Sequence, residues 1–232
     1  MTRRLLLFDI DGTLLLSAGA GRRAILAAIE EDVRDLEPLR GIRFDGKTDP
    51  QIVAELFEAG GDPEPRELAR MSRVLERYVA LLEHELSSPD HGAASMPGVP
   101  DLLARLGRTT TAVLGLLTGN VVPGARLKLR AAGIDYEQFL VGAYGSDHSS
   151  RAALPPIAAK RAEPYFGRIP GGTEVVIIGD TPADVACAAS IGARTIAVAT
   201  GGYTEAELAE AGADVVLPDL SDVARACDAM LG

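Results

Sequence analysis

The sequence predicts an α/β fold, in which a parallel sheet is flanked by helices and an all-helical segment is inserted after the first strand. Short, continuous apolar runs recur along the chain, as in strands that are buried on both faces of a sheet. Segments with the spacing of helices separate the later runs. Strands that alternate with helices are typical of right-handed βαβ units, so the strands are expected to be parallel.

The individual elements follow from these patterns. We expect strands at residues 5–8, 112–117, 175–178, 195–199 and 215–217, and core helices at residues 125–132, 152–162, 183–191 and 204–211. The first strand is expected in the centre, between the strands that end at Leu117 and Ile178. The carboxyl ends of these three strands then meet at one edge, which brings Asp9, Thr118 and Asp180 around one cleft.

The segment from residue 17 to residue 93 differs from the rest of the chain. It shows helical patterns at residues 22–33, 50–59 and 65–86 and no convincing strand. Glycine, serine and proline gather at its two borders, residues 17–21 and 87–92. We therefore expect two domains, an α/β core of residues 1–16 and 94–232 and an inserted α-helical cap domain of residues 17–93.

The composition narrows the function. Of the 232 residues, 47% are hydrophobic and 24% charged, as in globular proteins. The formal net charge of −10 argues against nucleic acid or an anionic membrane as partner. The apolar run at residues 5–8 is too short for an export signal or a transmembrane helix. Two cysteines, Cys187 and Cys227, are too few for a disulfide framework, so we expect a reduced, cytoplasmic protein. The sequence does not predict the oligomeric state.

The strongest chemical signal is a pair of aspartates, Asp9 and Asp11, directly after the first expected strand and followed by Gly12 and Thr13. Two carboxylates this close need a proton or a cation beside them. Mg²⁺ prefers oxygen ligands and commonly binds carboxylates together with phosphate oxygens. Asp9 is then placed to attack a phosphate, and Asp11 to act as general acid and base. A solvated turn is the alternative for this fragment alone.

The second expected core strand also ends in polar residues, Thr118, Gly119 and Asn120. Their hydroxyl, amide and backbone groups can donate hydrogen bonds to phosphate oxygens. Thr118 and Asn120 can equally well cap the helix that follows. The fragment alone leaves both interpretations open.

Asp180 follows the strand at residues 175–178. Thr181, Pro182 and Asp184 form a capping-box-like helix start, which gives Asp184 a structural role. Because that role does not explain Asp180, we assign Asp180 to a metal and Asp184 to orienting the ligands or a basic group.

A phosphate also needs a fixed positive charge. Arg151 stands just before the helix at residues 152–162, whereas Lys160 lies further along it and is the alternative. In the insert, Lys47 precedes a helix that Thr48 or Asp49 is expected to cap. Lys47 could reach a substrate when the cap closes.

In this order, the motifs resemble those of the haloacid dehalogenase (HAD) superfamily: Asp9-x-Asp11-Gly-Thr, Thr118-Gly-Asn, a basic residue, and Gly179-Asp180-Thr-x-x-Asp184. The resemblance extends from residue 5 to about residue 217 and implies a Rossmann-like parallel sheet core, the HAD fold. The helical insert resembles the small cap of phosphoglycolate phosphatases and β-phosphoglucomutases.

The resemblance also implies roles for individual residues. It implies Asp9 as nucleophile, Asp11 as general acid and base, Thr118 and Asn120 as phosphate ligands, and Asp9, the Asp11 backbone carbonyl, Asp180 and Asp184 as the Mg²⁺ site. In one motif the chain departs from the family. The basic residue is usually Lys followed by Pro, whereas here Arg151 precedes Ala152, and Arg differs from Lys in reach and hydration.

These observations predict a Mg²⁺-dependent phosphatase that hydrolyses a small phosphorylated metabolite through an aspartyl-phosphate. Two aspartates in the first motif favour phosphoryl transfer over dehalogenation, because an alcohol leaving group needs the acid at Asp11. By resemblance, phosphoglycolate is the first candidate substrate. A phosphomutase of the β-phosphoglucomutase type is the alternative with the same core. A non-enzymatic phospho-receiver module is the alternative from another class, although a receiver has no helical insert.

Overall fold

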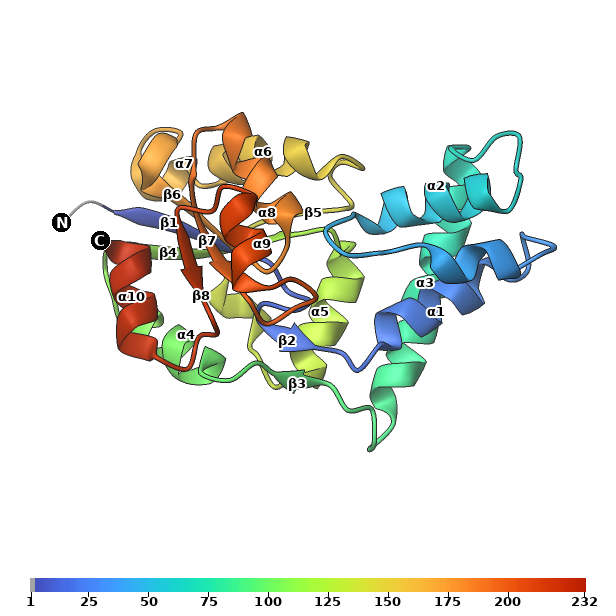
Figure 1. Cartoon of the computed structure of the whole chain (residues 1–232), viewed down its shortest axis with the longest axis horizontal. Coiled ribbons are helices and arrows are strands. Elements are labelled where there is room, and N and C mark those ends of the chain that lie inside the picture. The colour runs from blue at the N-terminus through green and yellow to red at the C-terminus, as the bar shows by residue number, and fades with distance from the viewer. Residues whose placement is uncertain (1–2) are drawn as a thin grey trace.

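The computed structural model of the chain describes residues 3–232, so Met1 and Thr2 of the expected core segment 1–16 lie outside the described residues. Its main sheet has six strands in the order β5-β4-β1-β6-β7-β8 (Figure 1). These strands are β1 (Arg4–Phe8), β4 (Ala112–Thr118), β5 (Val141–Tyr144), β6 (Val175–Gly179), β7 (Arg194–Val198) and β8 (Val215–Leu217). Every neighbouring pair is parallel, which confirms the predicted fold class.

Strand β1 lies in the centre of the sheet, as predicted. Leu5 is opposite Val113 of β4 on one side and Val175 of β6 on the other. The carboxyl ends of β1, β4 and β6 therefore meet at one edge of the sheet. The five predicted strands all form, whereas β5 was not predicted.

Helices cover both faces of the sheet. They are α4 (Val99–Gly107), α5 (Val122–Ala131), α6 (Leu154–Arg161), α7 (Glu163–Phe166), α8 (Pro182–Cys187), α9 (Glu205–Glu210) and α10 (Val223–Leu231). Leu6 and Phe8 of β1 pack in one apolar cluster with α4, α5 and α10. Leu5 and Leu7 point to the opposite face, in a cluster with α6 and α8. This alternation is the period of two expected for a strand with two buried faces.

Short 3-10 turns supplement the α-helices. They are η1 (Glu37–Gly41), η2 (Tyr136–Gln138), η3 (Arg151–Ala153), η4 (Gly172–Glu174) and η5 (Ala188–Ser190). The helix predicted at residues 183–191 is α8 followed by η5, and it ends before Gly192, whose φ of 64° interrupts helical geometry. The helix predicted at residues 152–162 starts as η3, since Pro155 and Pro156 have no N–H to donate and fit only the first turn of α6.

The segment between residues 17 and 93, called the insert below, holds α1 (Ala20–Ile29), α2 (Asp49–Ala59) and α3 (Leu68–Ser87). These helices lie together at one end of the molecule (Figure 1) and share an apolar cluster that includes Ile25, Phe57 and Tyr78. Val121 and Leu127, next to and within α5, join the same cluster, so the insert packs on the sheet domain.

Both connections to the insert run side by side. Strands β2 (Leu15–Leu16) and β3 (Ala94–Ser95) form a two-stranded antiparallel ribbon at the predicted borders. Whether residues 17–93 move as a separate cap domain stays a prediction. Within residues 3–232, no helix has the length and apolar character needed to span a bilayer.

Candidate active site

Three buried carboxylates meet at the carboxyl edge of the sheet. Asp9 directly follows β1, Asp180 follows β6, and Asp184 lies in α8; one oxygen from each lies within 4.8 Å of the others. Burial raises the pKa of Asp9 to about 6, although the nearby Arg151 guanidinium opposes the shift. Burial likewise raises the pKa of Asp180 well above its usual value, and the Asp184 charge adds to the effect. Carboxylates held like this favour a cation beside them.

The start of α8 fixes Asp184 as predicted. Thr181 is the N-cap, and its hydroxyl and N–H donate to Asp184 Oδ2 at 2.6 and 3.0 Å, while the N–H of Asp184 donates to Thr181 Oγ1. The predicted capping box is therefore confirmed. Asp180 stands outside it and accepts a hydrogen bond from the Thr13 hydroxyl at 3.1 Å.

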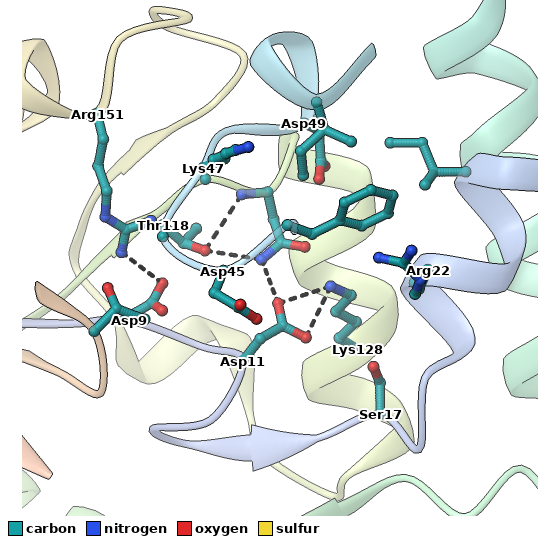
Figure 2. A pocket seen from close by; sticks show the side chains of 18 of the residues that line it. Asp9, Asp11, Ser17, Arg22, Asp45, Lys47, Asp49, Thr118, Lys128 and Arg151 are labelled. Atoms are coloured by element: carbon teal, nitrogen blue, oxygen red, sulfur yellow. Dashed lines mark hydrogen bonds and ion pairs between the residues drawn. The ribbon is translucent and has the colours of Figure 1, made fainter. Parts of the chain in front are cut away.

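Arg151 is the cation that meets this cluster. It begins η3 and is buried, and its Nη2 lies 3.0 Å from Asp9 Oδ1 (Figure 2). The same Nη2 forms an ion pair with Asp184. Burial would lower the pKa of this guanidinium, but the carboxylates of Asp184 and Asp9 hold it well above its usual value. The alternative candidate, Lys160, is exposed. The structure thus brings Arg151 to the carboxylates, and its role toward a phosphate stays a prediction.

The carboxylate of Asp11 does not join the cluster. Lys128 Nζ lies 2.9 and 2.7 Å from its two oxygens, and Asn120 Nδ2 donates to Oδ2 at 2.8 Å (Figure 2). Its side chain is 40% exposed, against 9% for the Asp9 side chain. The two aspartates of the first motif therefore face different partners, and each has a cation of its own.

Thr118 and Asn120, at the end of β4, do not cap the next helix. The N-cap of α5 is Val121, and the N–H of Val122 donates to Ser146 Oγ at 3.0 Å, so the capping interpretation of Thr118 and Asn120 is wrong. Instead, Asn120 Nδ2 donates to Thr118 Oγ1 at 2.8 Å, and both side chains are buried on the site. A phosphate-binding role for them is consistent with this arrangement but stays a prediction.

The loop before α2 brings the insert onto the site. Of the two predicted capping residues, Thr48 and Asp49, the N-cap of α2 is Thr48. Its hydroxyl also donates a hydrogen bond to the Ser149 carbonyl at 2.6 Å. Asp49 accepts a hydrogen bond from the N–H of Val121 at 2.8 Å. A Cβ at Gly119 would collide with the carbonyl of Lys47, so only glycine allows this close contact.

A cavity of about 220 Å³ lies between the insert and the sheet domain. From the sheet domain it is lined by Asp9, Asp11, Thr118, Gly119, Asn120, Lys128, Arg151, Asp180 and Thr181. From the insert it is lined by Ser17, Gly19, Gly21, Arg22, Ile25, Phe44, Asp45, Gly46, Lys47, Asp49, Ile52 and Tyr78. Lys47 lines the cavity as expected, but its ammonium forms an ion pair with Glu55. All predicted site residues except Asp184 line this one cavity.

The sequence interpretation missed Lys128. This lysine lies in α5 between Leu127 and Leu129 and is only 5% exposed. It follows Gly124 by one helical turn, and both are buried on the side of α5 that faces Tyr78 and Gly21 of the insert. The sequence offers no clear signal for it, because Lys128 alternates with Arg126 and Arg130 along the same helix.

Comparisons with known proteins agree with this geometry. Residues 153–223 match a family model described as HAD-hydrolase-like. The chain is 29% identical over 231 residues to a probable phosphatase, IndB, of Dickeya dadantii, which covers 98% of this chain and 94% of that protein. It is 28% identical over 223 residues to a phosphoglycolate phosphatase of Rhodospirillum rubrum, which covers 94% of this chain and 88% of that one. The chain is thus similar to HAD-like hydrolases, by a family model over residues 153–223 and by relatives over nearly its whole length.

Solved structures share the fold of this chain. A hydrolase from Pseudomonas syringae superposes over 100% of both chains with a TM-score of 0.72 at 21% sequence identity. The predicted family and the predicted enzyme class, a phosphatase, are confirmed. The cluster of Asp9, Asp180 and Asp184 can hold a metal ion.

Proposed function

We propose that this HAD-like phosphatase hydrolyses a small phosphomonoester through an aspartyl-phosphate on Asp9. The observation that carries the proposal is the position of Asp9, buried beside Arg151 at 3.0 Å and open to the same cavity as Asp11. A nucleophilic carboxylate, a fixed cation and a second carboxyl group are the parts that phosphoryl transfer to a side chain requires.

Asp9, Asp180 and Asp184 fit a divalent cation, because three buried carboxylates offer hard oxygen ligands. Within residues 3–232, Arg151 pairs with Asp9 and Asp184, and Asp180 has no salt bridge. We propose Mg²⁺, held by Asp9, Asp180 and the backbone carbonyl of Asp11, with Asp184 as a further ligand or a group that orients Arg151. When bound, Mg²⁺ would supply positive charge against which a phosphate can approach the carboxylates.

In the proposed reaction, Asp9, Asp11 and Arg151 have separate roles. A carboxylate oxygen of Asp9 attacks phosphorus, the bond from phosphorus to the ester oxygen breaks, and Asp11 gives a proton to that oxygen. Water then attacks the phosphorus of the aspartyl-phosphate while Asp11 accepts its proton, which releases phosphate and restores Asp9. Arg151 balances the phosphate charge throughout.

The remaining predicted residues would bind the phosphate oxygens. Thr118, the N–H of Gly119 and Asn120 lie on the cavity wall at the end of β4 and offer donors there. Lys47 approaches from the insert, and we propose that residues 17–93 act as a cap that closes over the substrate.

The size of the cavity supports a small substrate. A space of about 220 Å³ suits a few carbon atoms and a phosphate rather than a polymer. The related protein from Rhodospirillum rubrum is named a phosphoglycolate phosphatase, and phosphoglycolate is our first candidate. The net charge of −10 supports a small metabolite over nucleic acid or a membrane as partner.

The test is turnover of p-nitrophenyl phosphate and of a panel of phosphorylated metabolites, with Mg²⁺ and with EDTA. We expect Mg²⁺-dependent release of phosphate, which a phospho-receiver module would not sustain, and the largest kcat/KM for phosphoglycolate. Asp9→Asn should abolish turnover and trapping of a phosphoenzyme, while the same change at the exposed Asp90 should alter neither. Normal turnover by Asp9→Asn would refute the proposal.

A further inference from the structure

Lys128 is a buried cation that has no role in the proposed reaction. Its side chain is 6% exposed, and its ammonium contacts both oxygens of Asp11, at 2.9 and 2.7 Å. Lysine is almost never buried to this degree without a charged partner. Within residues 3–232, Asp11 is the only salt-bridge partner of Lys128. The charge of Lys128 also acts on the buried Asp49, where it opposes the rise in pKa that burial causes.

The ammonium lies under the insert. A Cβ at Gly21 of α1 would lie 3.1 Å from Lys128 Nζ and 3.8 Å from the hydroxyl of Tyr78 in α3. The missing side chain at Gly21 therefore lets α1 pack directly over the lysine. Water is kept from one side of the ion pair, which strengthens its hydrogen bonds relative to an exposed pair.

The contacts fix the orientation of the Asp11 carboxylate from two sides. Oδ1 accepts a hydrogen bond from Lys128 of α5, and Oδ2 accepts hydrogen bonds from both Lys128 and Asn120. Asp9 and Asp184 form their salt bridges with Arg151 and not with the lysine. One cation thus serves the nucleophile, and a different one serves the general acid and base.

We propose that Lys128 is a positioning residue that holds Asp11 as an oriented carboxylate, ready to accept a proton from the water that attacks the aspartyl-phosphate. The inference rests on the proposed function of Asp9 and Asp11. A base must lie within hydrogen-bond distance of the proton that it accepts. A carboxylate that rotates freely about its side-chain torsions adopts that position only a small fraction of the time. Lys128 itself neither contacts the phosphate nor exchanges a proton in this role.

The step can be isolated with p-nitrophenyl phosphate. Its leaving group hardly needs a proton, so formation of the phosphoenzyme proceeds without Asp11, whereas its hydrolysis still requires the base. In Lys128→Met we expect a rapid burst of p-nitrophenol followed by a steady-state rate about 10²-fold below that of the wild type. Phosphoenzyme should accumulate in rapid-quench samples, and KM should not rise.

Three further variants separate positioning from other roles. Lys128→Arg keeps the buried charge and should lose less steady-state rate than Lys128→Met, and it serves as the test if the Met variant does not fold. Lys160→Met makes the same change at an exposed lysine and should behave as the wild type. The double variant Asp11→Asn/Lys128→Met should match Asp11→Asn within about twofold, because Lys128 acts only through Asp11.

Each outcome decides between the claims. An unchanged steady-state rate in Lys128→Met, an equal loss in burst and steady state, a raised KM, or additive losses in the double variant would overturn the role of Lys128. Those results leave the proposed function intact as long as Asp9→Asn is inactive. Turnover by Asp9→Asn, or a wild type that forms no phosphoenzyme, would remove the proposed function and this inference together.

Discussion

Replacing Arg151 by Met should cost the folded protein several kcal/mol. Arg151 is 7% exposed, and its guanidinium is paired with Asp9 and Asp184, whose oxygens lie within 4.8 Å of an oxygen of Asp180. Removing one partner of a buried ion pair leaves the other charge uncompensated and typically costs about 3–5 kcal/mol. Two carboxylates, Asp9 and Asp184, pair with this guanidinium and the buried Asp180 lies beside them, so we expect the upper part of that range when no metal is present.

The assay is urea unfolding of the wild type and of Arg151→Met, each with EDTA and with Mg²⁺. Arg161→Met is the matched control, because Arg161 pairs with Asp147 but its side chain is 46% exposed. An exposed pair contributes about 1 kcal/mol or less, so the control should lose little. Mg²⁺ should restore part of the loss in Arg151→Met, since the cation replaces the missing charge. A loss below about 1 kcal/mol for Arg151→Met in EDTA would refute this account of the carboxylate cluster.

Two other predictions concern metal binding and pH. Asp180→Asn should weaken Mg²⁺ binding in calorimetry together with activity, and unchanged affinity would exclude Asp180 as a ligand. Burial raises the pKa of Asp49 to about 6 from 3.8, so the folded protein gains stability from protonated Asp49 below about pH 4 and loses it as the pH rises through 6. Asp49→Asn removes this dependence. In urea unfolding, the free energy of unfolding of the variant should rise relative to that of the wild type by about 3 kcal/mol between pH 4 and 7. If the two free energies change in parallel with pH, the assignment is wrong.

The fold was predictable wherever the local pattern decides the structure. The apolar runs at β1, β4 and β6 are buried on both faces of a parallel sheet, so their sequences identify them without alternation. Strand β5 was missed because its four residues, Val141–Tyr144, include a glycine and form too short a run. Helices α4 and α10 were also missed, although their buried residues have helical spacing.

The candidate site was predictable to the extent that it lies at strand ends. Asp9, Thr118 and Asp180 line one cavity because the parallel strands before them end at the same edge. Arg151 was preferred over Lys160 because it stands just before a helix, and the structure brings Arg151 to Asp9 and Asp184. Lys128 was missed because tertiary packing decides whether a helical lysine meets solvent or Asp11.

The contact between Gly119 and the carbonyl of Lys47 has a consequence for how this enzyme can diverge. A Cβ at Gly119 would push the insert away from the sheet domain, and a Cβ at Gly145 would collide with the Gly119 carbonyl itself. Both glycines are tied to the site, since the Gly119 carbonyl accepts a hydrogen bond from the N–H of Asp49 and the N–H of Gly145 donates to the Asn120 carbonyl. A larger residue at either position would therefore disturb the seat of the insert and the proposed phosphate ligands together, so these two positions leave little room for divergence.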